Sequence, residues 1–331
     1  MDASLQATSD RLTQARAQAD AAALADALLR HANALAGAGQ LASASTALDE
    51  ALQLQRQRDA RDDVLRCLLL SAELLRLQGR RAEAGERARE ALAMTASGTP
   101  DRAQAQAVAG EIALSDGDAA GAERAFDEAL AIAGHAPAWW HSRARARAAL
   151  GRFEEAAADL EAASHRCAAL NDGAGARRAA VEAATAWHRA GRLDRATALI
   201  AATSAQARAA RDHAALGALE LLDATAALER RDAAAARTHA HAARQHALAA
   251  RAPETYIGAT IALSRLAEHA NDDATAYGTL ASGWATVSDL LGSDLARAAF
   301  EPMLREQRLR WGSERFDAAR AAYEAARRAQ A

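Results

Sequence analysis

A turn recurs along the chain at a nearly constant interval, and this interval limits the possible folds more than any other feature of the sequence. The turns are centred on Gly39, Gly79, Gly117, Gly151, Gly191, Arg231 and Asn271, so successive turns are 40, 38, 34, 40, 40 and 40 residues apart. Periods of this length are typical of helical solenoids. Glycine suits a tight turn because it accepts left-handed backbone angles, and asparagine is the next best residue there. Arg231 departs from this chemistry, so we expect its turn to have a different shape.

Small residues stand at three fixed distances from every turn. Seven residues before it the series is Ala32, Ala72, Gly110, Ala144, Ala184, Ala224 and Ser264. Five residues after it the series is Ala44, Ala84, Ala122, Ala156, Ala196, Ala236 and Ala276, and twelve after it Ala51, Ala91, Ala129, Ala163, Thr203, Ala243 and Gly283. A fourth column, nine residues after the turn, is apolar throughout: Leu48, Ala88, Phe126, Leu160, Ile200, Ala240 and Leu280. Small side chains are needed where helix axes approach closely, and larger ones fill the space beside them. Each repeat is therefore predicted to be two antiparallel helices joined by a tight turn.

The composition favours helices throughout. Hydrophobic residues make up 51% of the 331 residues but aromatic residues only 4%, because most of the apolar residues are alanine and leucine. These two residue types, with the abundant arginine and glutamate, are strong helix formers. Pro100, Pro137 and Pro253 fall where one repeat passes to the next, and we expect them in the first turn of a helix, with Thr99 as the N-cap before Pro100. The predicted fold class is all-α.

The two ends of the chain differ from the repeats, as the ends of a solenoid should. Residues 1–20 are predicted to be an N-terminal helical segment, residues 21–291 the repeat array, and residues 292–331 two C-terminal capping helices. Pro302 lies inside the first capping helix and is expected to kink it. The aromatic residues of this segment, such as Trp311 and Phe316, leave two interpretations open: a cap that closes the core of the last repeat, or a docking or dimer surface.

Part of one repeat matches the pattern of a known family. The matching residues are Gly110, Gly117, Ala122, Phe126, Ala129, Leu130 and Trp140. On these residues the chain resembles the tetratricopeptide repeat family over about residues 20–291. It departs from the family in having units near 40 rather than 34 residues, like long-unit bacterial members, and in lacking the frequent proline between units. The resemblance implies a right-handed α-solenoid of about seven antiparallel helix pairs followed by the two capping helices.

The resemblance also implies a binding surface, because in this family the first helix of each unit lines a concave groove. Residues thirteen, ten, six and three before each turn are then expected to face that groove. The candidate groove residues are Arg66, Glu73, Arg76, His141, Arg145, Arg178, His188, Arg189 and Arg265. Arginine binds carboxylates through its planar donor fork, so an acidic peptide, helix or C-terminus is the expected class of protein partner. Chaperone binding is not expected, because Leu29 stands where the chaperone-binding members have a lysine.

No catalytic residue, cofactor site or metal site is predicted. The paired acids in residues 58–63 and 271–273 lie next to turns, where aspartate commonly caps helices. His239 and His241 point in different directions on a helix, and His246 is too far along it to share an ion with His239, so solvated histidines are expected. Arg143 and Arg147 lie on one helix face, which leaves open a structural role or a contact with an anionic group of a partner.

Charge and cysteine content exclude further classes. The net charge is −3 without a basic excess, which argues against nucleic acid, and all 40 basic residues are arginine, which excludes a Schiff-base or P-loop lysine. The sequence shows no signal peptide and no apolar run near the ~20 residues that span a bilayer. Cys67 and Cys167 are expected to be reduced thiols. We therefore expect a cytoplasmic protein without membrane contact, of open oligomeric state.

Three functions remain after these exclusions. The favoured one is a non-enzymatic protein–protein interaction scaffold or adaptor that presents its groove to a peptide or protein. The alternative is a peptide- or ligand-responsive regulator that controls a partner through a change of superhelical shape. The third, an enzyme on an α-solenoid, would be marked by a deep polar pocket with converging acids.

Overall fold

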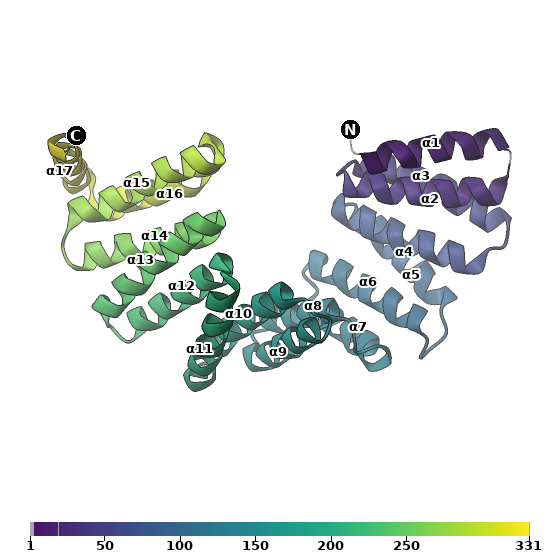
Figure 1. The fold of residues 1–331 in the computed structure, drawn as a ribbon, viewed down its shortest axis with the longest axis horizontal. Helices are drawn as coiled ribbons and strands as arrows, with labels where there is room; N and C mark the ends of the chain where they lie inside the picture. The colour runs from purple at the N-terminus through teal and green to yellow at the C-terminus, as the bar shows by residue number, and fades with distance from the viewer. Residues whose placement is uncertain (1–2, 19, 331) are drawn as a thin grey trace. The chain divides into compact units, whose positions relative to one another are not determined.

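The computed structural model describes residues 3–18 and 20–330, and all the regular elements in these ranges are α-helices (Figure 1). The helices are α1 (Ala3–Gln18), α2 (Ala21–Gly37), α3 (Leu41–Gln57), α4 (Arg61–Leu77), α5 (Arg81–Met94), α6 (Pro100–Asp116), α7 (Ala119–Ile132), α8 (Pro137–Ala149), α9 (Phe153–Ala169), α10 (Gly173–Arg189), α11 (Leu193–Ala210), α12 (His213–Glu229), α13 (Ala233–Ala250), α14 (Pro253–His269), α15 (Asp273–Leu291), α16 (Ser293–Trp311) and α17 (Ser313–Gln330). They form two compact units, Met1–Leu170 and Asn171–Ala331, which we call the N-terminal unit and the C-terminal unit.

The predicted turns join the helices in seven pairs, from α2–α3 to α14–α15. All seven turn residues have left-handed backbone angles, with φ between 57° at Asn271 and 81° at Gly117. The prediction of a different turn at Arg231 is wrong. Its φ is 60°, and the Asp232 N–H donates to the Ala227 carbonyl at 2.9 Å, as the Asp272 N–H donates to the Ala267 carbonyl at 2.9 Å. The ordered helix ends on both sides impose the left-handed conformation on arginine, although it costs a side-chain-bearing residue about 1–2 kcal/mol.

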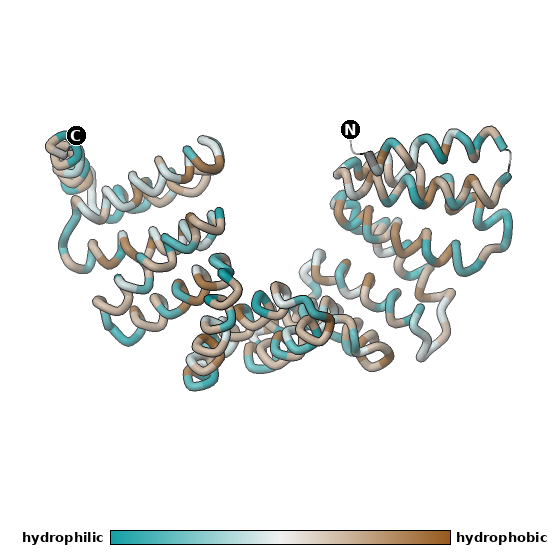
Figure 2. The backbone as a smooth tube through the Cα atoms, viewed as in Figure 1, coloured by the Kyte–Doolittle hydropathy of each residue, from teal (hydrophilic) through white to brown (hydrophobic). Residues whose placement is uncertain are grey.

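The four repeat columns are buried throughout, which confirms the predicted register. Ala122 and Ala156 are 0% exposed and Ala196 is 3% exposed. One column shows directly why its residue must be small: a Cβ atom on Gly110 would lie 2.8 Å from two ring carbons of Phe126, which is itself fully buried. Figure 2 shows apolar residues interleaved with polar ones along the helices of both units, as expected of helices with one buried face.

Packing within each unit is local. Consecutive helices pack against each other, and the first helices of successive pairs also touch, as α4 touches α6 and α12 touches both α10 and α14. The predicted N-terminal signals are confirmed, because the Thr99 hydroxyl accepts a hydrogen bond from the Arg102 N–H at 3.2 Å and Pro100, Pro137 and Pro253 open their helices. The first helices therefore form a layer of their own along each stack.

The C-terminal cap consists of α16 and α17, and α17 packs across α15 as well as α16. Tyr277 of α15 lies edge-on to the rings of Phe316 and Tyr323, with centroid distances of 5.3 and 5.8 Å. Arg315 donates to both carboxylate oxygens of Asp273 at 2.7 Å, and this hydrogen bonding lowers the pKa of Asp273. α16 is helical on both sides of Pro302, and the kink expected there stays a prediction, as does the handedness of the superhelix.

Candidate functional site

A cavity of about 550 Å³ lies in the C-terminal unit on the face formed by the first helices. Its lining residues are Val181, Thr185, His188, Arg189, Ala218, Leu221, Leu222, Thr225, Glu229, Glu254 and Thr255, and we call it the inner groove. Most of the lining residues from α10 and α12 stand thirteen, ten, six or three residues before a turn, which are the four register positions that the spacing rule predicts to face the groove. Val181, Thr185 and His188 stand ten, six and three residues before the turn at Gly191, and Ala218, Leu221 and Thr225 stand thirteen, ten and six before Arg231.

The floor of the inner groove is apolar and its margins carry both charges. Val181, Leu221 and Leu222 supply apolar surface, and Leu222 is buried. The His188 side chain is 8% exposed, and its Nε2 lies 3.1 Å from Glu229 Oε2, although the two groups are not aligned for a hydrogen bond. Glu229 and Glu254 are absent from the predicted set. Glu229 stands two residues before the turn at Arg231, just as the predicted Arg189 stands two residues before the turn at Gly191.

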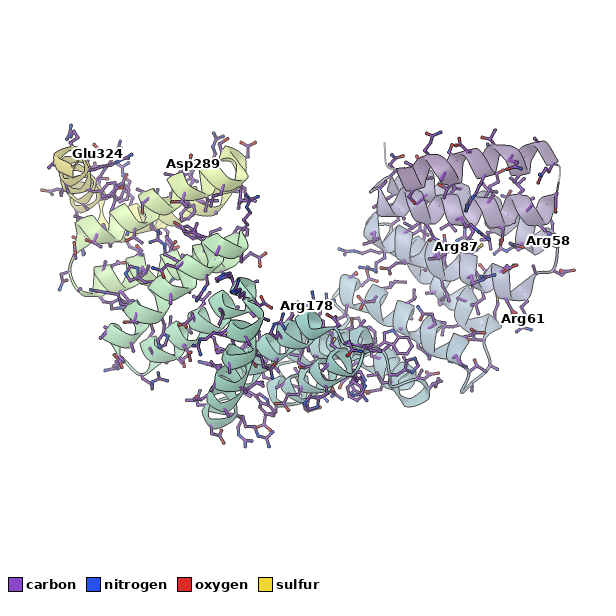
Figure 3. The ribbon with its side chains drawn as sticks, viewed as in Figure 1. Arg58, Arg61, Arg87, Arg178, Asp289 and Glu324 are labelled. Carbon is purple, nitrogen blue, oxygen red and sulfur yellow. The ribbon has the colours of Figure 1, made fainter. Side chains whose placement is uncertain are left out.

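Arg178 stands thirteen residues before the turn at Gly191, so it continues the stripe of Val181, Thr185 and His188 toward the beginning of α10. Figure 3 labels Arg178. Its side chain is exposed and forms no hydrogen bond or ion pair within residues 3–18 and 20–330. Arg265 of α14 is likewise exposed and has no side-chain partner in the described part of the chain. These two guanidinium groups are therefore available to an anionic partner.

A second cavity, of about 260 Å³, lies between α14 and the cap helix α16, and we call it the cap cavity. Its lining residues are Ile261, Ser264, Arg265, Glu268, Leu280, Met303, Glu306, Gln307 and Arg310. Ile261, Arg265 and Glu268 stand at three of the four register positions before the turn at Asn271. Glu268 is already engaged, because it accepts from Arg310 Nη1 at 2.9 Å and from the indole of Trp311 at 2.6 Å.

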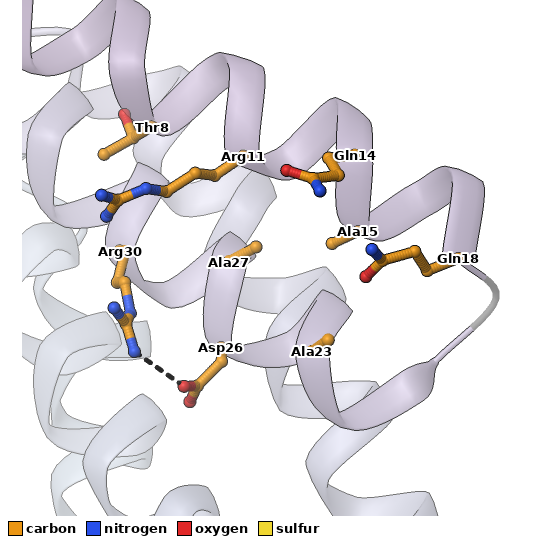
Figure 4. Close-up of a pocket in the computed structure, with 9 residues that line it drawn as sticks. All are labelled: Thr8, Arg11, Gln14, Ala15, Gln18, Ala23, Asp26, Ala27 and Arg30. Atoms are coloured by element: carbon orange, nitrogen blue, oxygen red, sulfur yellow. Dashed lines mark hydrogen bonds and ion pairs between the residues drawn. The ribbon is translucent and has the colours of Figure 1, made fainter.

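A third cavity, of about 300 Å³, lies in the N-terminal unit between α1 and α2 (Figure 4). α1 contributes Arg11, Gln14 and Gln18, and α2 contributes Asp26 and Arg30, whose side chains form an ion pair at 3.0 Å. The spacing rule does not reach this site, because α1 precedes the first helix pair.

The predicted groove residues of the N-terminal unit lie on α4 and α8 and have acidic neighbours. Arg76 donates to Glu73 and, at 3.3 Å, to Ser115, and the hydrogen bonding to Glu73 raises the pKa of Arg76. Arg66 pairs with Asp63, and Arg145 Nη1 lies 3.7 Å from Glu111. His141, also on α8, is half-buried. The acidic neighbours offset much of the positive charge that these arginines bring to this unit.

Arg143 and Arg147 have a structural role in the N-terminal unit. The Asp159 carboxylate, 3% exposed, accepts from Arg143 Nη2 at 2.7 Å and from Arg147 Nη1 at 2.9 Å. Arg147 also donates to Glu123 of α7 at 2.9 Å. This network ties α7, α8 and α9 together, so these two arginines are already occupied inside the protein.

The acid and histidine motifs serve local contacts. Asp272 caps α15 by accepting the Thr275 N–H at 3.1 Å. His239 Nδ1 lies 2.7 Å from Glu220, and His246 Nδ1 lies 3.0 Å from the same atom of His213, so these two histidines have partners that helix periodicity does not reveal. Within residues 3–18 and 20–330, no group of three or more His, Cys, Asp or Glu side chains could hold a metal ion. None of the helices described is long and apolar enough to cross a membrane.

Comparison with solved structures identifies the fold. A tetratricopeptide repeat protein from Parabacteroides merdae ATCC 43184 superimposes with a TM-score of 0.54 at 14% identity, over 82% of this chain and 98% of the other. The fold is the tetratricopeptide repeat fold. BtubC (BKLC) from P. vanneervenii is similar at a TM-score of 0.55 and 18% identity, over 63% of this chain and 91% of its own. Aspartyl phosphate phosphatase F from Bacillus subtilis is similar at 0.53 and 13%, over 82% and 73%. No family model and no curated protein matches the sequence of this tetratricopeptide-type chain.

Proposed function

We propose that this protein is a non-enzymatic interaction scaffold that holds an acidic peptide segment of a protein partner in the inner groove of the C-terminal unit. The observation that carries the proposal is the cavity of about 550 Å³ on the face formed by the first helices. This is the face on which the spacing of the repeats predicts the binding groove. Its size is within the range of about 300–1,000 Å³ that is typical of ligand sites. The tetratricopeptide-type fold supports a scaffold role in general.

The chemistry of the inner groove favours a peptide with one apolar anchor and a nearby carboxylate. Val181, Leu221 and Leu222 give the anchor an apolar floor, and burying an apolar side chain such as leucine contributes about 1.5–3 kcal/mol. Arg178, which has no partner within the described residues, lies along the same stripe and can bind the carboxylate. Glu229 and Glu254 repel a uniformly acidic segment, so the acid of the partner belongs at the Arg178 end.

Capture of the native partner from lysate, identification by mass spectrometry and titration against variants tests this function. Replacing Arg178 with Glu should weaken binding at least about tenfold at low salt, with a smaller loss at high salt. Arg145→Glu should change the affinity little, because Arg145 lies in the N-terminal unit and already has Glu111 as a neighbour. Arg297→Glu is the matched control, since Arg297 is exposed on α16 and has no partner among the described residues. Unchanged affinity of the Arg178→Glu variant at low salt would place the partner elsewhere.

The same titration distinguishes the proposed scaffold from the alternative function, a regulator that responds to its ligand. A regulator that acts through its superhelical shape should change its small-angle X-ray scattering profile when the partner binds, whereas a rigid scaffold should not. Localisation in the cytoplasm is part of the proposal and is tested by fractionation of cells that produce the native chain.

A further inference from the structure

Three leucines of the C-terminal unit surround a shallow apolar hollow and remain exposed. Leu248, near the end of α13, is 41% exposed, and Leu290 and Leu291, at the end of α15, are 50% and 39% exposed. Pro253, the first residue of α14, lines the same hollow. Single exposed leucines are ordinary on a protein surface, but exposed apolar residues that gather at one place mark an interaction site. We call this surface the leucine edge, because it lies where α13 passes to α14 and α15 passes to α16.

The packing of the repeats does not account for these leucines. Leu248 stands seventeen residues after the turn at Arg231, and Leu291 stands twenty after the turn at Asn271. Seventeen residues after the other turns the chain has Arg56, Ala96, Gly134, Ala168, Arg208 and Ser288. Twenty residues after the other turns it has Asp59, Thr99, Pro137, Asn171, Arg211 and Arg251. None of these is a large aliphatic residue, so the other repeats complete the same junction without one.

Unpaired charges of opposite sign flank the leucine edge. Arg211 and Arg251, at the junctions before α12 and α14, are exposed and have no side-chain partner within the described residues. Asp289 (Figure 3) and Asp294 lie on either side of the junction between α15 and α16, and they too are exposed and unpaired in the described part of the chain. Arg297, three residues beyond Asp294, offsets part of this negative charge without reversing its sign. The edge therefore has a positive end, an apolar centre and a negative end.

We propose that the leucine edge binds the leucine edge of a second copy of this chain about a two-fold axis. Such an axis brings the same surface of both copies together in opposite directions, so the positive end of one copy meets the negative end of the other. Arg251 of each copy then faces Asp289 of the other copy, and the leucines of both copies leave water together. A partner with charge of one sign would place like charges together at one end, so the polarity of the edge favours a second copy.

The small apolar centre predicts how this dimer responds to salt. A stable interface buries about 800 Å² on each partner, and three partly exposed leucines supply only a fraction of that area. The charges at the two ends must therefore contribute to association, and attraction between exposed charges is screened by salt. We expect a dimer that forms at low salt and dissociates as the salt concentration rises.

The first experiment tests the surface by sedimentation velocity of the full chain over a concentration series at low and at high salt. Leu290→Glu should raise the dissociation constant of the dimer at least about tenfold, because it places a charge against the apolar centre of the other copy. Leu309→Glu is the matched control, since Leu309 is 79% exposed at the opposite end of α16 and should leave the constant unchanged. A chain that stays monomeric at every concentration at low salt overturns the inference, as does a dimer that is indifferent to Leu290→Glu.

The second experiment tests the orientation of the two copies. Neutralising one exposed charge has little effect, so the variants reverse a charge instead. Arg251→Asp and Asp289→Arg should each weaken its own homodimer at least about fivefold, because like charges then face each other at both ends. Aspartate tolerates the left-handed conformation of residue 251, so the first variant should fold normally.

An equal mixture of these two variants should form a heterodimer as stable as the wild-type dimer, because opposite charges face each other again at both ends. Native mass spectrometry resolves the heterodimer from the two homodimers by mass. A mixture that dimerises no better than either variant alone overturns the two-fold arrangement. None of the substituted residues lines the inner groove, so that outcome leaves the proposed function standing.

Discussion

At the scale of single residues, the alanine five positions after each turn is almost completely buried. Ala156 of α9 is 0% exposed, and its equivalents in the other six repeats are 3% exposed or less. Leucine at this position adds three heavy atoms to a close contact between helices. Overpacking of this kind costs about 1–3 kcal/mol, so Ala156→Leu should lower the urea midpoint of unfolding.

Ala325 of α17 provides the control for this substitution, since it is exposed on the last helix. Ala325→Leu should leave the midpoint nearly unchanged, because surface substitutions usually have little effect. Equal midpoints for the two variants would contradict the register of the repeats.

The two cysteines differ in reactivity because they differ in burial. Cys67 of α4 is 0% exposed, and burial raises the pKa of its thiol to about 11, whereas Cys167 of α9 is half-buried. Because the thiolate is the nucleophile, only about a thousandth of Cys67 is reactive at pH 8. A thiol reagent should therefore modify Cys167 in the folded protein and Cys67 only after unfolding, as peptide mapping by mass spectrometry would show. Fast labelling of Cys67 in the native state would contradict its burial.

At the scale of helices, the Asp159 network links α7, α8 and α9. Arg143 and Arg147 are 13% and 15% exposed, so Asp159→Asn leaves two buried cations that share fewer carboxylates. Breaking a buried pair from one side costs about 3–5 kcal/mol, and the lower end applies here because Asp127 and Glu123 remain. Asp289→Asn, at an exposed position of α15 without a partner in the described chain, should change the denaturation midpoint little. Equal midpoints would show that the network contributes nothing to stability.

Spacing along the chain predicts some features of these helices and misses others for a physical reason. The columns are predictable because each depends only on distance from its own turn, as Ala122 does. The bond between Arg147 and Asp159 depends on how α8 and α9 rotate against each other, which no periodicity records. Arg189 and Glu229 both line the inner groove although each stands only two residues before its turn, outside the four register positions. The side-chain amide of Gln307 of α16, buried without a hydrogen-bond partner in the described part of the chain, likewise has no sequence signal, because its state depends on the side chains that surround it.

At the scale of the whole molecule, stability should be distributed locally. Within each unit, substantial helix contacts join only consecutive or next-but-one helices. The stability of such an array is approximately the sum of the stabilities of its repeats and of the interfaces between them, so destabilisation of one repeat stays local. Asp159→Asn should therefore speed amide hydrogen exchange in α7–α9 and leave α14–α17 unchanged. Mass-spectrometric exchange on both proteins measures this, and uniform acceleration along the chain would indicate a single cooperative unit.

The contact between Gly110 and Phe126 has an evolutionary consequence. A methyl group at Gly110 meets the phenyl ring, so this step costs less in a lineage in which Phe126 has already become smaller. The order of the two mutations therefore matters. This is epistasis that arises from the steric volume of the two side chains. Paired substitutions of this kind preserve the contact between two helices while changing both of the residues that form it. They are one route by which a chain can share its fold with proteins at 13–18% identity while no family model matches it.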